Sequence, residues 1–155
     1  MTTPSTRFGG SMVALATPFA GDAIDWTAFA AMIERQIAHG SSALVPCGSS
    51  GEAATLDHDE HAEVVRFTVE QARGRVPVIA GTGSNSTKEA IRLTSAAKQA
   101  GAAAALMISP YYNRPTQEGI RRHYLAVADA VDLPIIAYNI PSRTGSRIEA
   151  ATIGP

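Results

Sequence analysis

Cysteine is nearly absent from this sequence, because Cys47 is the only one in 155 residues. A single thiol cannot form an internal disulfide, which excludes a disulfide-rich secreted domain and favours a reducing cytoplasm. No apolar run approaches the roughly 18–20 residues of a membrane span. The N-terminal residues also lack the basic and apolar segments of a secretory signal. We therefore expect neither a membrane partner nor export.

An excess of charge is missing as well. The formal net charge is −1, with 13 basic against 14 acidic residues, which argues against a nucleic-acid partner. Lysine is scarce, because only Lys88 and Lys98 among the basic residues are lysines. With 45% hydrophobic and 17% charged residues, the chain has the composition of a globular domain, but this composition does not indicate a chemistry.

The chain contains a regular alternation of apolar and amphipathic segments. Apolar, strand-like runs begin near residues 11, 43, 76, 103 and 134, at intervals of roughly 30 residues, the length of a βα unit. Helical patterns occupy residues 25–40, 57–74, 86–101 and 116–131. The strands are apolar almost throughout, as parallel strands covered on both faces are. An α/β protein with a parallel sheet is therefore predicted.

Capping residues support the predicted helices. In the first helix, Phe29, Ile33 and Ile37 form one apolar stripe. The residues that can cap the four helix starts are Asp25, Asp57, Ser86 and Thr116, and glycines stand at three helix ends, Gly40, Gly74 and Gly101.

Two architectures have this alternation, an open doubly wound sheet and a (β/α)8 barrel. The doubly wound sheet needs a dinucleotide loop, but residues 81–86 place Ser86 where G-x-G-x-x-G has its third glycine. No acidic residue follows about 20 residues later to contact a ribose. Polar residues instead cluster after each strand, where a barrel places its chemistry. We predict a (β/α)8 TIM barrel, of which residues 1–155 supply the first four βα units and strand five, as the N-terminal part of one domain.

Three polar clusters at the predicted strand ends could hold a small anion. Residues 48–52 (GSSGE) offer backbone N–H groups and two hydroxyls suited to a carboxylate, although such a turn can equally be structural. Residues 110–115 (PYYNRP) place two phenols side by side, or form only an aromatic turn braced by prolines. Residues 138–145 (YNIPSRTG) present Tyr138 and Arg143, and a guanidinium can clamp a carboxylate with two hydrogen bonds.

Residues 57–61 (DHDEH) could be a metal site, because His58 and His61 lie at i, i+3 on one helical face. A helix N-cap followed by an acidic first turn explains them better, since the helix dipole favours acidic residues there. We therefore predict no metal ion, and we predict that His39 and His123 are structural histidines on helix surfaces, without partners.

In order and spacing, the segments 48–61, 77–87, 109–119 and 138–145 resemble the dihydrodipicolinate synthase family. The likeness runs from about residue 10 to the end of the chain. Each segment also occurs in related aldolases, but YYNRP together with PSRTG is typical of the synthases. The resemblance implies a lyase that condenses pyruvate with L-aspartate-4-semialdehyde through a lysine Schiff base, in the diaminopimelate route to L-lysine. It also implies a cytoplasmic homotetramer without metal or organic cofactor.

The resemblance further implies roles for the residues that match the family's motifs. Tyr138 is the implied general acid/base, with Ser49 and Tyr112 as its partners in a proton relay. Ser50 is implied to hold the pyruvate carboxylate, and Arg143 the semialdehyde carboxylate. Serines replace the usual threonines at positions 49 and 50, which keeps the hydroxyls but loosens their rotamers. The residues that match the family's allosteric site for L-lysine are His58, His61, Asn85, Glu89 and Tyr111.

The family's Schiff-base lysine lies on strand six, and this sequence ends before that strand. Lys88 and Lys98 both fall in the third predicted helix, away from any strand end. We therefore expect the N-terminal part of an active enzyme, unable to form the imine by itself. Two alternatives stay open: a sister pyruvate aldolase such as an N-acetylneuraminate lyase, and a non-catalytic half-barrel if the chain truly ends at Pro155.

Overall fold

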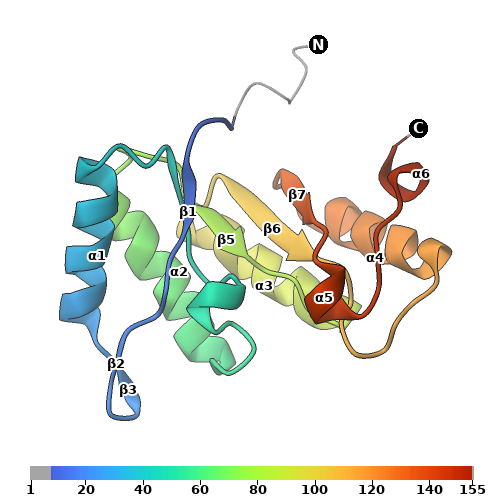
Figure 1. The fold of residues 1–155 in the computed structure, drawn as a ribbon, viewed down its shortest axis with the longest axis horizontal. Coiled ribbons are helices and arrows are strands. Elements are labelled where there is room, and N and C mark those ends of the chain that lie inside the picture. The colour runs from blue at the N-terminus through green and yellow to red at the C-terminus, as the bar shows by residue number, and fades with distance from the viewer. Residues whose placement is uncertain (1–7, 155) are drawn as a thin grey trace.

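The computed structural model describes residues 8–154, so residues 1–7, where we expect no secretory signal, lie outside it. Within the described range, every predicted strand and helix is present (Figure 1). The strands are β1 (Met12–Ala14), β4 (Ala43–Val45), β5 (Ile79–Gly81), β6 (Ala104–Ile108) and β7 (Ile135–Tyr138). The long helices are α1 (Trp26–Ala38), α2 (His58–Ala72), α3 (Thr87–Ala100) and α4 (Gln117–Ala130).

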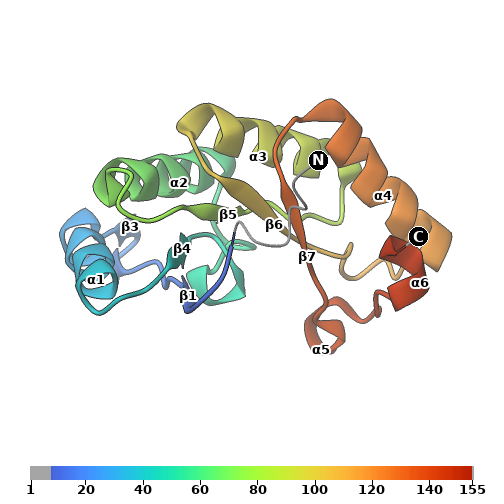
Figure 2. The same cartoon turned by 90° about the horizontal axis from the view of Figure 1, so that it is seen from above.

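The strands form a parallel sheet in chain order. β1 pairs with β4, and β6 lies between β5 and β7. A parallel bridge between Leu44 and Val78, together with a 2.9 Å hydrogen bond from Gly81 N to Pro46 O, connects β4 to β5. Seen from above, α1 to α4 form an arc along one face of this curved sheet (Figure 2). Helices on one face belong to a barrel wall, so the doubly wound alternative is wrong and the partial (β/α)8 barrel is confirmed.

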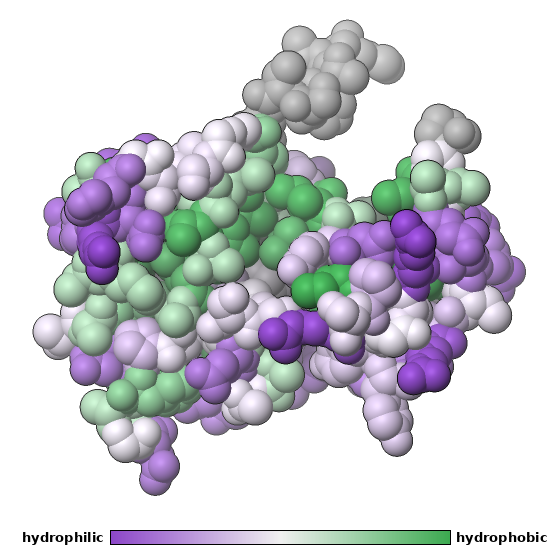
Figure 3. Space-filling view, in the orientation of Figure 1, coloured by the Kyte–Doolittle hydropathy of each residue, from purple (hydrophilic) through white to green (hydrophobic). Residues whose placement is uncertain are grey.

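Alternate strand residues build two apolar layers. On the side facing the helices, Leu44 and Ala80 are buried against Phe29, Ile33 and Val64. On the inner side, a smaller cluster contains four buried residues, Ala43, Val45, Ile79 and Ala104. In the orientation of Figure 1, hydrophobic residues gather over the strands, between hydrophilic ends of the molecule (Figure 3). Both faces of the sheet are therefore apolar, which explains why the strands show no polar alternation in the sequence.

The predicted helix caps are confirmed. The four capping side chains each accept a hydrogen bond from a backbone N–H of the first turn: Asp25, Asp57, Ser86 and Thr116. Asp57 also forms a capping box with Glu60, whose side chain accepts from the Asp57 N–H. Gly101 ends α3 with φ +92°, a conformation that glycine adopts without strain. The DHDEH segment is thus a helix start.

The first predicted strand is shorter than expected. The apolar run that begins near residue 11 continues to Phe19 in the sequence, but β1 ends at Ala14. Phe19 instead pairs with Ile24 in the antiparallel hairpin of β2 (Phe19–Ala20) and β3 (Ala23–Ile24). Pro18 has no N–H to donate to a ladder, and Gly21 turns the chain with φ +65°. Apolar composition alone does not reveal this break.

His123 is not on a helix surface, and that prediction is wrong. Only 4% of its area is exposed, because α3 packs against α4. Its Nδ1 lies 2.9 Å from Thr87 Oγ1, whereas its buried Nε2 has no partner among the described residues. Burial lowers the pKa of His123 below its usual 6.5. By contrast, His39 is exposed as predicted, although its Nδ1 bonds Arg35 O at 2.8 Å.

Acid is expected to destabilise this protein through its buried histidines. The pKa of His123 and that of His61 are lowered by burial in the folded state, so below the unfolded value of 6.5 the unfolded chain binds more protons. The urea midpoint should therefore fall between about pH 7.5 and pH 5.5. His123→Leu should reduce this fall, whereas His39→Leu, at an exposed position, should leave it unchanged. An identical fall in all three proteins would contradict the assignment.

Candidate active site

A cavity of about 370 Å³ opens at the carboxyl ends of β4 to β7. The segment after β4 contributes Gly48 and Ser49, β5 contributes Gly81, and β7 contributes Tyr138 from its last residue. The carboxyl ends of parallel strands are where barrels carry chemistry. Residues at the predicted strand ends therefore line a cavity, which we call the central cavity.

Ser49 and Tyr138, far apart in sequence, both line the central cavity. Neither hydroxyl has a hydrogen-bond partner among residues 8–154, and Tyr138 is only half-buried. Both groups are thus available to exchange protons with a molecule in the cavity.

Thr17 anchors the turn that contains Ser49 and Ser50, which we call the serine turn. Ser49–Gly51 form one 3₁₀ turn, and the buried Thr17 hydroxyl donates a 2.7 Å hydrogen bond to Gly51 O. A Cβ on Gly51 would lie 2.9 Å from Leu15 O, so only glycine lets this turn pack so closely on the end of β1. This buried Thr17 contact helps to fix where Ser49 lies.

A second cavity, of about 390 Å³, adjoins the first, and we call it the outer cavity. Ser49, Ile108 and Tyr111 line both cavities, while Arg143 and Tyr112 line the outer one only. Arg143 belongs to α5 (Pro141–Thr144), the short helix that follows β7. An anion in the outer cavity would meet this guanidinium next to the central cavity.

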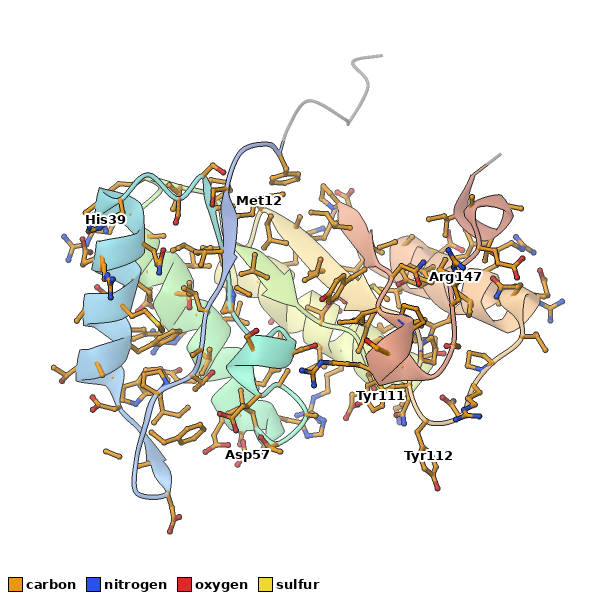
Figure 4. The ribbon with its side chains drawn as sticks, in the orientation of Figure 1. Met12, His39, Asp57, Tyr111, Tyr112 and Arg147 are labelled. Carbon is orange, nitrogen blue, oxygen red and sulfur yellow. The ribbon has the colours of Figure 1, made fainter. Side chains whose placement is uncertain are left out.

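Ser50 and Tyr112, both predicted site residues, lie away from the central cavity. Ser50 is exposed and lines neither cavity. The side chain of Tyr112 is 91% exposed and points away from the body of the molecule (Figure 4). Its φ of +71° is rare for a bulky residue and turns it outward while Tyr111 turns inward. Within one chain, the structure therefore brings Ser49 and Tyr138 together, but not Ser50 or Tyr112.

Four of the five residues matched to a lysine site also line the central cavity: His58, His61, Glu89 and Tyr111. His58 Nε2 lies 2.7 Å from Glu89 Oε1, and Ser84 donates a second hydrogen bond to the same carboxylate. These two bonds, that of Ser84 first, lower the pKa of Glu89 and keep it ionised. His61 is buried, and its Nε2 lies 2.9 Å from Gly81 O.

Asn85 lies outside the central cavity, and the structure shows a role for the neighbouring Ser84. Asn85 does not line the central cavity, and its backbone oxygen accepts a 3.4 Å hydrogen bond from Asn113. Ser84 is buried and holds Glu89, a role that sequence reasoning missed. The only signal was its place in the polar loop after β5. The cluster is thus an ionised carboxylate facing a cavity, which suits a cationic ligand.

The thiol of Cys47 is poorly suited to act as a nucleophile at this site. Cys47 lines the central cavity, but burial raises the pKa of its thiol to about 12, so the thiolate is scarce at neutral pH. Among residues 8–154, no three histidine, cysteine, aspartate or glutamate side chains gather closely enough to hold a metal ion. None of the helices in that range is both long and apolar enough to cross a bilayer.

Comparison with known proteins identifies the family. The family model described as dihydrodipicolinate synthetase matches residues 7–155. The chain belongs to this family. A 4-hydroxy-tetrahydrodipicolinate synthase of Rhodospirillum centenum is 59% identical over 146 residues, which cover 94% of this chain and 50% of that relative.

Solved structures of the dihydrodipicolinate synthetase family have the same fold. The Acinetobacter baumannii enzyme complexed with pyruvate is 49% identical, with a TM-score of 0.91 over 92% of this chain and 50% of that one. The Cyanidioschyzon merolae enzyme with lysine bound is 40% identical, with a TM-score of 0.88 over 92% and 50%. The chain spans about half the length of the relatives it matches.

Proposed function

We propose that the protein is a 4-hydroxy-tetrahydrodipicolinate synthase, which condenses pyruvate with L-aspartate-4-semialdehyde in the diaminopimelate route to L-lysine. This proposal is carried by one observation: two hydroxyls and a guanidinium without partners among residues 8–154 line adjoining cavities at the strand ends. They belong to Ser49, Tyr138 and Arg143. The curated relative of the same name favours this reaction over that of a sister aldolase.

In the proposed reaction, pyruvate forms an imine with a lysine and loses a C3 proton to become an enamine. The enamine carbon then attacks the aldehyde carbon of the second substrate, and the oxygen of that aldehyde must gain a proton. In this proposal Tyr138 supplies this proton and Ser49 passes a replacement to it, and the support is that both residues line the central cavity. A phenol acting as a general acid must be reprotonated, so a chain of hydroxyls that returns the proton lowers the cost of this step. In this proposal, the lysine that forms the imine is the one on strand six of the family's barrel.

The proposed proton relay needs a second copy of the chain. Tyr112, its third member, is 91% exposed and does not line its own central cavity. We propose that Tyr112 enters the site of a neighbouring copy, within a cytoplasmic homotetramer. Ser50, exposed at the mouth of the serine turn, is proposed to bind the carboxylate of pyruvate.

Arg143→Ala tests the proposed role of the outer cavity. In the protein at its natural length, losing a two-bond clamp on a carboxylate should raise the activation free energy for the semialdehyde by about 2–3 kcal/mol. The value of kcat/KM should therefore fall roughly 30- to 150-fold. Imine formation with pyruvate should change little. Arg147→Ala is the matched control, because Arg147 is exposed in the same segment and lines neither cavity. Equal damage to pyruvate imine formation would overturn the assignment.

Feedback inhibition by L-lysine is proposed for the Glu89 cluster. The carboxylate faces the central cavity beside His58 and Tyr111, and can receive the ε-ammonium of the ligand. Calorimetry on the assembled protein should detect L-lysine binding, and Glu89→Gln should weaken it at least about tenfold, since a charged hydrogen bond is lost. Glu63→Gln, on the exposed face of α2, is the matched control. Absence of heat from the unmodified protein would refute this regulatory proposal.

A further inference from the structure

Asn139, the residue after β7, is bonded to Ile148 at both ends of its carboxamide. Its Nδ2 donates to Ile148 O at 2.9 Å, and its Oδ1 accepts from Ile148 N at 3.0 Å. The two residues are nine positions apart, so this pair closes the base of the intervening loop. Residues 140–148 form that loop, which contains α5, and we call it the Arg143 turn. After it, the chain runs beside α4 to α6 (Ala150–Ile153) (Figure 1).

The Arg143 side chain does not determine its own position. It is exposed, and it has no hydrogen-bond or ion partner among the described residues. A long side chain without contacts samples many rotamers around its own Cα. Where the guanidinium can reach is therefore decided by where the backbone of the Arg143 turn lies.

Hydrogen bonds within the Arg143 turn fix its internal conformation but do not attach it to the sheet. The N–H groups of Arg143 and Thr144 both donate to Ile140 O, at 3.0 and 3.1 Å. The buried Thr144 hydroxyl donates to Ser146 O at 2.7 Å. All of these partners lie inside the turn, so these bonds alone do not attach it to the sheet. Two further contacts reach the turn from other elements: Ser146 Oγ lies 3.3 Å from Ser109 Oγ, and Gln117 Nε2 donates to Arg147 O at 2.7 Å.

Contacts at the base of the turn attach it to the sheet. One end is continuous with β7, and the Asn139–Ile148 pair ties the other end to the same strand. The Ile148 side chain, 4% exposed, is buried with Met107 and Ile120 in the cluster between β6 and the helices. A loop whose two ends are pinned side by side cannot swing freely.

We propose that Asn139 is a positioning residue that holds the Arg143 turn at the outer cavity, and so selects a second substrate that carries an anionic group. The identity of the substrate in this inference rests on the proposed function, whereas the fixed position of the Arg143 turn does not. Asn139 itself lines neither the central nor the outer cavity, so it acts through the turn and not on a substrate.

Gln117 on α4 provides a matched comparison. Its Nε2 donates to Arg147 O at 2.7 Å, and its Oε1 accepts from Glu149 N at 3.2 Å. These bonds hold the chain at and beyond the far end of the Arg143 turn, leaving the Asn139–Ile148 pair in place. Gln117→Ala thus removes a similar carboxamide clamp at residues 147 and 149, near the end of the turn, and leaves the Asn139–Ile148 pair intact.

Hydrogen exchange tests the positioning independently of any reaction. In the protein at its natural length, Asn139→Ala should speed exchange at the amides of Ile148, Arg143 and Thr144 by about tenfold or more, because the turn now opens locally. Asn139→Asp, which keeps the acceptor for Ile148 N–H, should have a smaller effect. Gln117→Ala should affect Glu149 and leave Arg143 and Thr144 protected. Unchanged exchange at Arg143 and Thr144 in Asn139→Ala would overturn the inference.

Kinetics then separate positioning from general loss of stability. Asn139→Ala should raise KM for the semialdehyde about tenfold and leave KM for pyruvate unchanged, since displacements of about 1 Å at a site have effects of this order. Tyr124→Phe, which removes a buried 2.7 Å hydrogen bond to Met107 O and leaves the Asn139–Ile148 pair intact, should lower stability without this split. A fast-exchanging turn with equal KM changes would also overturn the inference. If the unmodified protein makes no product, the proposed function fails and the exchange result alone decides.

Discussion

Reaction of the 155-residue chain with pyruvate and borohydride is expected to leave its intact mass unchanged. Borohydride traps an imine only where a neutral amine has already attacked the pyruvate carbonyl, which requires a lysine desolvated inside the site. Lys88 and Lys98 are the chain's lysines, and both lie exposed on α3. Lys98 Nζ lies 3.7 Å from an Asp132 carboxylate oxygen, and neither side chain lines the central or outer cavity.

Both amines are exposed to water outside the two cavities, so neither is placed to attack a pyruvate bound in the site. A natural-length 4-hydroxy-tetrahydrodipicolinate synthase, treated in parallel, serves as the positive control and should gain the reduced adduct. A stoichiometric adduct on the 155-residue chain would mean that the nucleophile has been misplaced and that one of these two lysines approaches the site.

Substitution Tyr138→Phe should have the largest effect on turnover of any single change at the central cavity. A positioned acid/base contributes about 10²- to 10⁴-fold, so kcat of the natural-length protein should fall by at least about a hundredfold. The ring remains, and the Tyr138 hydroxyl has no partner among residues 8–154 to lose, so the fold should be unaffected.

Tyr124→Phe is the matched control for Tyr138→Phe. It deletes a buried hydroxyl whose burial raises its pKa and whose partner is a backbone oxygen, so it should reduce stability and leave kcat almost unchanged. Loss of activity in Tyr124→Phe together with near-normal kcat in Tyr138→Phe would reverse the roles assigned to the two phenols.

The elements of the fold could be predicted because their signals are local. Asp25 and Thr116 each cap a helix within three residues of their own position, so sequence alone indicates the start. The hairpin after β1 could not be predicted in this way, since its apolar residues resemble the strand they interrupt. His123 was missed for a different reason, because its burial comes from α3, and its partner Thr87 is 36 residues away in the chain.

At the candidate site, residue types were more predictable than orientations. Tyr138 and Ser49 follow apolar strands, and strand ends of a parallel sheet meet at one edge, so their meeting in the central cavity follows from topology. The outward orientation of Tyr112 depends on a φ of +71°. This value is rare for a tyrosine, and the sequence does not indicate it. The bond from Ser84 to Glu89 and the clamp of Asn139 on Ile148 depend on loop geometry, which the residue types alone do not specify.

Product formation by the natural-length protein tests the central claim most directly. Pyruvate should be offered with L-aspartate-4-semialdehyde and, separately, with the N-acetylated amino sugar that a neuraminate lyase would use. Catalysed condensation with the semialdehyde and none with the sugar is the predicted result. Turnover with the sugar, or with neither partner, would contradict the proposed synthase.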